Sequence, residues 1–132
     1  PVKYKVALGN SLGEYQMVFR IAEQYLIRAE ARLQLNNLTG ALDDLNTIRN
    51  RAGLPNSNAT DAGSLRIALE KERRAELFTE WGCRWFDLKR WGRSTAVLGP
   101  AKAPNWQDTD TLYPIPRIEI SNNPNLTQNP GY

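Results

Sequence analysis

Residues 18–55 have the sequence VFRIAEQYLIRAEARLQLNNLTGALDDLNTIRNRAGLP, and no other part of the chain says as much about its architecture. Apolar residues recur there every three or four positions, over residues 18–36 and again over 40–52, which is the period of one face of an α-helix. The first stripe consists of Phe19, Ala22, Leu26, Ala29 and Leu33, and the second of Ala41, Leu45, Ile48 and Ala52. Only a few residues separate the two predicted helices, and so short a connection makes neighbours antiparallel. The pattern therefore predicts an αα-hairpin.

The ends of the second helix carry their own signals. Thr39 is the predicted N-cap, and Asp43 and Asp44 follow in the first turns, where the helix dipole favours acidic side chains. Gly53 suits the position after the last turn, and Pro55 stops further helix. Ahead of the hairpin, residues 1–17 show little periodicity, and we expect a loop or linker there.

Beyond the hairpin, residues 56–63 are polar and small, as in a loop. Ser64 is the predicted N-cap of a third helix over residues 65–81, and a shorter helix is predicted over 84–92, after Gly82.

The last third of the sequence has a different composition. Six prolines lie between residues 99 and 132, which disfavours helix. Short extended segments are predicted at residues 112–116 and 118–120. The tail over 122–132 is too polar to fold alone, so we expect it to lie on the helices or to be mobile. The predicted fold is mainly α, a helical hairpin with further helices, a loop-rich C-terminal segment and little β.

Two carboxylates interrupt the apolar face of the third predicted helix. Glu72 and Glu76 fall on the same stripe as Leu65, whereas Leu77 and Trp81 fall on the opposite side. A carboxylate that faces a core is costly unless a cation pairs with it. Arginines are abundant nearby, and Arg49 and Arg51 of the second helix are further candidates. We therefore predict a structural ion-pair cluster made of Glu72, Arg73, Arg74, Glu76, Arg84, Asp87 and Arg90.

The same two glutamates admit a catalytic interpretation. A spacing of four places both on one helical face, as a glycosidase pair would require. Catalytic carboxylates, however, need a cleft and a raised pKa, which surrounding arginines oppose. The chain has no histidine, so Ser-His-Asp and Cys-His arrangements and the commonest zinc ligand are excluded. We predict no catalytic residue, no metal site and no cofactor, and a carboxylate-based hydrolase stays as an alternative.

Four tryptophans are the remaining candidates for a binding role. Trp81, Trp85 and Trp91 are expected to pack in the core, because Trp81, Trp85 and Leu88 follow one another at about one helical turn. Trp106 lies in a loop and is the candidate for stacking on a ligand, although packing under the proline-rich loop is the favoured interpretation. Cys83 is the only cysteine, so no internal disulfide forms, and we assign it no role.

The overall composition is that of a folded domain. The 132 residues are 41 % hydrophobic and 23 % charged, with a net charge of +3. Acidic residues interrupt the basic runs over 70–90, so we predict no nucleic-acid surface. The start, Pro1-Val2-Lys3, has neither an initiator methionine nor a signal peptide. We therefore expect the chain to begin in mid-protein or after processing.

Four pieces of the sequence, in order, resemble the SusD/RagB family. Residues 72–91, ERRAELFTEWGCRWFDLKRW, resemble the family's ERR-x-EL…E-G-x-R-W-F-D-L-x-R-W signature. Residues 25–31, YLIRAEA, and 45–55, LNTIRNRAGLP, resemble two earlier family segments. Residues 113–116, YPIP, with the closing NPNLTQNPGY, resemble its ending. One departure is Trp81, which stands between the glutamate and the glycine of the signature.

The resemblance implies a function for a longer protein, with residues 18–132 as its C-terminal region. Family members lie on the exposed face of the outer membrane, anchored by an N-terminal lipid absent from this chain. They bind oligosaccharide, polysaccharide or other nutrients without catalysis and deliver them to a TonB-dependent transporter of the SusC type. Glycan contacts come largely from upstream loops, so the C-terminal signature is expected to be structural.

Two further expectations concern the hairpin over residues 18–53. It resembles one tetratricopeptide-type pair, with Ala29 and Ala41 at small-residue positions. A helical-repeat scaffold that binds a protein partner through this hairpin is the alternative function. One pair cannot bury its own stripe, so we expect the upstream part of the same protein to supply neighbouring helices. Alone, the chain is expected to be poorly stable or to self-associate.

Overall fold

The computed structural model describes residues 18–132, which form helices joined by loops and contain no strand. The chain divides into two compact units, one ending at Leu77 and the other running from Phe78 to Tyr132. The predicted mainly α fold is confirmed for this part of the chain. The loop or linker predicted over residues 1–17 lies outside the described residues.

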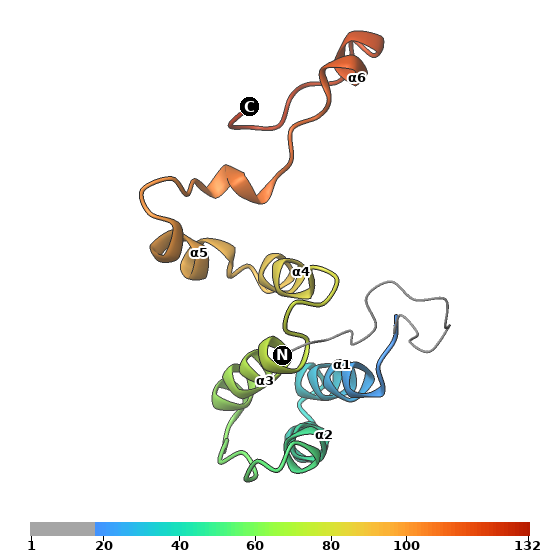
Figure 1. The fold of residues 1–132 in the computed structure, drawn as a ribbon, viewed down its shortest axis with the longest axis vertical. Helices are drawn as coiled ribbons and strands as arrows, with labels where there is room; N and C mark the ends of the chain where they lie inside the picture. The colour runs from blue at the N-terminus through green and yellow to red at the C-terminus, as the bar shows by residue number, and fades with distance from the viewer. Residues whose placement is uncertain (1–17) are drawn as a thin grey trace, which may run out of the picture. The chain divides into compact units, whose positions relative to one another are not determined.

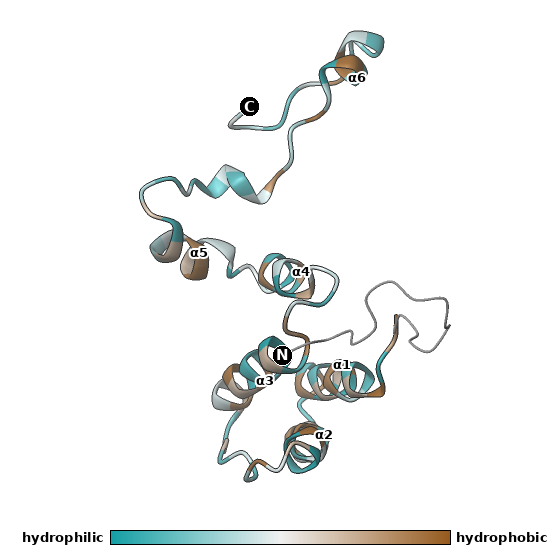
Figure 2. Cartoon of the chain, in the orientation of Figure 1, coloured by the Kyte–Doolittle hydropathy of each residue, from teal (hydrophilic) through white to brown (hydrophobic). Residues whose placement is uncertain are grey.

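The first unit is built from three helices. They are α1 (Ile21–Gln34), α2 (Leu38–Arg51) and α3 (Ala62–Glu76), and α1 packs against both of the others (Figure 1). Each of these helices carries apolar and polar residues, which Figure 2 shows as brown and teal on the same ribbon. Their buried apolar residues form one core of Ala22, Leu26, Ala29, Leu33, Ala41, Leu45, Ile48, Leu65 and Leu69. The αα-hairpin predicted from the two stripes is confirmed.

The ends of the hairpin helices differ from the prediction. Phe19 is 77 % exposed and precedes α1, because Arg20 is an extended N-cap residue. Asn37, rather than Thr39, caps α2, since its Oδ1 accepts the Gly40 N–H at 2.9 Å. At the other end Ala52 is exposed. Gly53 has φ +71°, the left-handed conformation expected after a last helical turn.

Helix α3 begins and ends earlier than predicted. Asp61, not Ser64, is the N-cap, and Ser64 is the reciprocal partner in a capping box. The helix ends at Glu76, whereas the prediction carried it to Trp81. Thr79 and Trp81 have φ +61° and +41°, which an α-helix does not accommodate. Trp81 therefore lies in a turn rather than on a packed helical face.

The capping box predicts a pH-dependent contribution to stability. The backbone N–H and then the hydroxyl of Ser64, followed by the Gly63 N–H, donate to the Asp61 carboxylate and lower its pKa below the ordinary 3.8. Because the pKa of Asp61 is lower in the folded state than in the unfolded state, its ionised carboxylate stabilises the fold above pH 3.8. This stabilisation is lost as the pH falls through the folded-state pKa. An Asp61→Asn variant keeps one side-chain acceptor oxygen, that of its amide, but does not titrate. In urea unfolding followed by circular dichroism, we expect the wild-type protein to have a higher free energy of unfolding than this variant near neutral pH. The difference should disappear in acid. A difference that is constant with pH would contradict the prediction.

The second unit contains shorter elements. They are α4 (Cys83–Arg90), α5 (Ser94–Lys102), the 3₁₀ helix η1 (Asp108–Thr111) and α6 (Arg117–Asn122), and α4 packs with α5. The helix predicted over 84–92 corresponds to α4.

Two short helices occur where prolines made helix unlikely. Helix α5 continues through Pro100 and ends soon after it, at Lys102. Helix α6 occupies residues predicted to be extended, with Pro116 as its N-cap. A proline is tolerated at that end because the first N–H groups of a helix have no intrahelical partner.

The polar tail is fastened to residues 112–115 within the same unit. The Gln128 amide accepts the Ile115 N–H at 2.7 Å and donates to its carbonyl oxygen at 2.9 Å. The Tyr132 hydroxyl donates to the Leu112 carbonyl at 2.8 Å. Gly131 has φ +96°, and a Cβ there would lie 2.6 Å from the Thr109 hydroxyl oxygen, so this position requires glycine.

Candidate functional site

The first candidate is the pair of glutamates on α3. Glu72 is only 6 % exposed, and its Oε2 accepts Nη1 of Arg49, from α2, at 2.9 Å. The Arg49 Nε also donates to the Pro55 carbonyl at 2.9 Å. One guanidinium therefore joins α2, α3 and the loop between them, an arrangement suited to fixing helices rather than to moving protons.

Glu76 is bound by two arginines from outside α3. Its carboxylate accepts Nη2 of Arg51 at 2.5 Å and also pairs with Arg20. Arg20 Nη1 donates to the Glu76 backbone oxygen at 2.9 Å. The hydrogen bond with Glu76 raises the pKa of Arg51 above its ordinary value. Arg20, the extended N-cap residue of α1, therefore connects the start of α1 to the C-terminal end of α3.

The burial and pairing of one further carboxylate were not predicted from the sequence. Asp44 on α2 is 3 % exposed and accepts a two-pronged bond from Arg28 of α1, Nε to Oδ2 at 3.0 Å and Nη2 to Oδ1 at 2.7 Å. Arg32 Nη1, one turn further along α1, donates to Asp44 Oδ2 at 2.7 Å. The hydrogen bond with Asp44 raises the pKa of Arg28. The sequence did contain a sign of this site, because Arg28 and Arg32 are four residues apart and therefore lie on one face of α1.

The other residues of the predicted cluster are divided between the units. Arg73 is buried on α3 and Arg74 is exposed on the same helix. In the second unit Asp87 is buried and accepts Nη2 of Arg90 at 3.0 Å, while Arg84 is half-buried on α4. Each unit thus has its own acidic and basic residues, and Arg49, Arg51 and Arg20 provide the bonds to Glu72 and Glu76.

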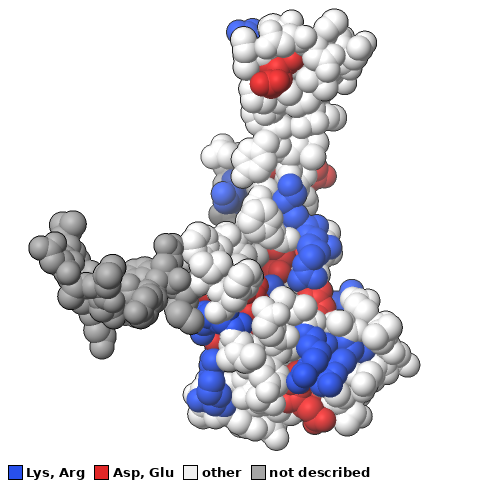
Figure 3. Space-filling model, turned by 90° about the vertical axis from the view of Figure 1, so that its right-hand side faces the viewer, with Lys and Arg blue, Asp and Glu red and all other residues white. Residues whose placement is uncertain are grey.

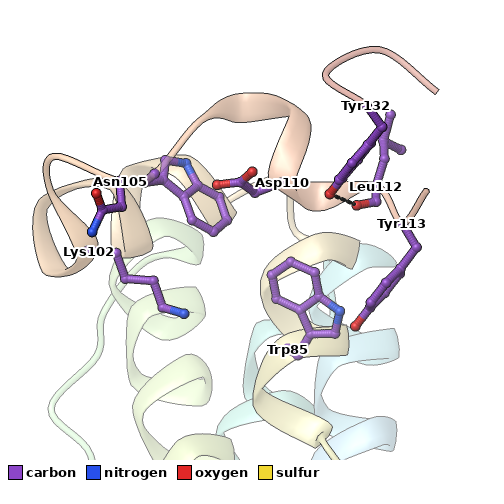
Figure 4. Close-up of a pocket in the computed structure, with 8 residues that line it drawn as sticks. Trp85, Lys102, Asn105, Asp110, Leu112, Tyr113 and Tyr132 are labelled. Atoms are coloured by element: carbon purple, nitrogen blue, oxygen red, sulfur yellow. Dashed lines mark hydrogen bonds between the residues drawn. The ribbon is translucent and has the colours of Figure 1, made fainter. Parts of the chain in front are cut away.

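The second candidate is a pocket in the second unit that includes Trp106. Its volume is about 490 Å³, and its lining residues are Trp85, Lys102, Asn105, Trp106, Asp110, Leu112, Tyr113 and Tyr132 (Figure 4). The Trp85 and Trp106 rings meet edge to face, with centroids 6.5 Å apart and planes at 77°. Concave sites of this size with aromatic and polar linings are typical of small-ligand binding.

Several contacts position the aromatic walls of this pocket. Trp106 Nε1 donates to the Thr95 hydroxyl at 3.3 Å, and that hydroxyl donates to Asp108 at 2.8 Å. The Lys89 ammonium lies 5.5 Å from the centroid of the Trp85 ring, on α4. Tyr132 enters the lining through its bond to Leu112, drawn as a dashed line in Figure 4.

The remaining tryptophans do not form the predicted packed group. Trp81 is 58 % exposed, so its expected place in the core is wrong. The cause is the turn at Thr79–Gly82, which ends α3 early. Trp91 is half-buried and lies beneath the Arg90 guanidinium, 5.0 Å from its ring centroid.

Surface charge, helix hydropathy and metal-ligand groups of the described residues bear on the kind of site that they can form. On the face drawn in Figure 3, blue basic atoms lie beside red acidic atoms, as expected for paired charges. Within residues 18–132, no helix has both the length and the apolarity to cross a bilayer. No group of three or more His, Cys, Asp or Glu suited to a metal ion occurs there either.

The family that this sequence matches is the SusD family. Its model matches residues 2–109 and 99–132. SusD-like protein P38 of Formosa agariphila is 34 % identical over 139 residues, covering 98 % of this chain. The starch-binding protein SusD of Bacteroides thetaiotaomicron is 30 % identical over 122 residues, covering 87 % of it. The chain belongs to the SusD family, as the four sequence segments indicated.

Solved structures agree with this assignment. A SusD superfamily protein from Bacteroides vulgatus matches 86 % of this chain at 29 % identity and a TM-score of 0.75. A SusD-like protein from Bacteroides fragilis matches 84 % at 34 % identity and a TM-score of 0.70. The chain spans 27 % of the length of P38 and 21 % of that of the starch-binding protein.

Proposed function

We propose that this chain is the C-terminal helical part of a glycan-binding protein that captures carbohydrate at the outer membrane. The observation that carries the proposal is the family match, which extends over residues 2–132 and includes a relative named for starch binding. The carbohydrate is delivered to a TonB-dependent transporter of the SusC type, and an N-terminal lipid anchors the protein to the membrane.

Within that protein, the first unit serves as scaffold. Three carboxylates are bonded to arginines from outside their own helix. Arg49 of α2 binds Glu72, and Arg28 of α1 binds Asp44. Glu76 is bound by Arg51 of α2 and by Arg20, the N-cap residue of α1. A buried carboxylate with its partner removed is strongly destabilising, so these pairs tie the helices to one relative placement. A general acid would instead need a carboxyl group whose pKa is raised, and arginine partners act in the opposite direction. The contacts therefore favour a structural role for these three carboxylates over a catalytic one.

The proposal predicts glycan binding without turnover. The longer protein that contains these residues should bind at least one polysaccharide in affinity electrophoresis across a panel of starch, xylan, mannan and laminarin. Reducing-sugar assays on the same panel should show no product above a blank, and Glu72→Gln should leave that result unchanged. Turnover that Glu72→Gln abolishes would establish a hydrolase instead.

The transporter is tested separately. Cross-linking in outer-membrane preparations, followed by affinity purification of the longer protein, should recover a TonB-dependent transporter. Recovery of a different protein partner by a variant that contains only the hairpin would support the helical-repeat scaffold instead.

A further inference from the structure

The aromatic side chains of the pocket in the second unit are arranged as walls around an open space. In Figure 4, Trp85 and Tyr113 stand on one side, and Lys102 and Asn105 on the other. Because Trp85 and Trp106 are nearly perpendicular, their rings present differently oriented surfaces to the same space. A sugar ring has an apolar face of C–H groups and an edge of hydroxyls, so a flat aromatic surface next to hydrogen-bonding groups is complementary to it.

The polar lining supplies such hydrogen-bonding groups. The side chains of Lys102 and Asn105 make no hydrogen bond within residues 18–132, so their donors and acceptor are available. Asp110 lines the pocket, its Oδ2 accepts the Gln107 N–H at 2.8 Å, and its other carboxylate oxygen accepts no hydrogen bond from the described residues. Ammonium, amide and carboxylate groups together bond to hydroxyls both as donors and as acceptors.

The charges of the lining favour a neutral ligand. Its ionisable side chains at neutral pH are one lysine and one aspartate, whose charges cancel. A phosphate-bearing ligand, or a nucleic acid whose bases stack on the tryptophans, would require an excess of cations. A neutral, hydroxyl-rich ring fits this combination of aromatic surface and balanced charge.

We propose that this pocket binds one neutral sugar ring of a glycan chain, stacked on an indole and bonded through its hydroxyls to Asn105, Lys102 and Asp110. The choice of ligand class rests on the proposed glycan function, whereas the location rests on the pocket alone. The proposal gives the second unit a direct part in binding, in addition to the scaffold role of the first.

Nuclear magnetic resonance of the indole groups tests the location. The longer protein carries ¹⁵N-labelled tryptophan and is titrated with the methyl glycosides of glucose, galactose, mannose and xylose. The indole signals of Trp85 and Trp106 should move with at least one sugar, while those of Trp81 and Trp91 stay in place. No movement of either pocket signal, or equal movement of all four, overturns the proposal. Movement in the 132-residue chain but not in the longer protein also overturns it, because other residues then fill the pocket.

A matched pair of variants tests the contribution to glycan affinity. In the longer protein, Trp106→Ala should weaken binding of its polysaccharide about tenfold, as for the loss of one stacked ring, while Trp91→Ala leaves it unchanged. Asn105→Ala should weaken binding several-fold without altering the thermal melt, because this residue is exposed and its side chain bonds to no described residue. Unchanged affinity in both pocket variants overturns this inference and leaves the proposed function intact. A protein that binds no polysaccharide contradicts the proposed function, and the indole signals then decide the pocket independently.

Discussion

Replacing Arg49 by methionine is expected to reduce the free energy of unfolding by about 3–5 kcal/mol. Methionine retains much of the apolar stem but removes the guanidinium that bonds to Glu72 and to the Pro55 carbonyl. The Glu72 carboxylate would then lie buried without this partner, and desolvation of a charge is the largest cost in that arrangement.

Urea unfolding followed by circular dichroism measures this effect, and Arg66→Met is the matched control. Arg66 is exposed on α3 and forms no ion pair among the described residues, so its replacement should cost less than about 0.5 kcal/mol. Both variants lose one positive charge and have the same net charge. Equal midpoints for the two would show that the Arg49–Glu72 pair does not stabilise the fold. In an Arg49→Met, Glu72→Met double variant, stability should partly return.

Leu26→Ala is expected to destabilise the first unit by about 2–5 kcal/mol. Leu26 is fully buried in the centre of the α1 stripe, within the core shared by α1, α2 and α3. Its truncation removes apolar contacts and leaves a cavity that close-packed neighbours fill only in part.

The control for this prediction is Leu35→Ala, in which the same side chain is lost from a position that is 81 % exposed. The melting temperature and urea midpoint of Leu26→Ala should lie below those of Leu35→Ala. The difference should make up most of the loss that Leu26→Ala shows relative to the wild-type protein. Similar losses in both would mean that the packing of α1 on α2 and α3 contributes little to stability, contrary to the structure.

The hairpin could be predicted from the sequence because its information is local. An apolar stripe with the helical period specifies the buried face of each helix, and a short connection specifies their relation. The cap residues were harder because alternatives lie close together. Asn37 competes with Thr39, and Asp61 with Ser64, and the choice depends on which side chain reaches a free N–H group.

Features that depend on distant residues were not predictable in the same way. Asp44 looked like a first-turn acid favourable to the helix dipole, and its burial depends on where Arg28 and Arg32 lie across the hairpin. The end of α3 depends on left-handed residues at Thr79 and Trp81, for which helical periodicity has no signal.

The pocket shows the same division. Trp106 was the candidate for stacking on a ligand because it was predicted to lie in a loop, but the other lining residues extend from Trp85 to Tyr132. Tyr132 joins this lining because the tail folds back on residues 112–115, through polar bonds that hydropathy does not reveal. One residue of the site was therefore a candidate from sequence, and the rest required the structure.

The contact between Gln128 and Ile115 has a consequence for substitution. Ile115 stands between Pro114 and Pro116, so it has the only backbone N–H of those three residues. Gln128 binds that N–H and the carbonyl of the same residue, and thus recognises main chain rather than side chain. Every amino acid except proline offers these two groups, whereas only an amide side chain of this length both donates and accepts. Variation at 115 is therefore limited by packing alone, and variation at 128 by hydrogen-bond chemistry.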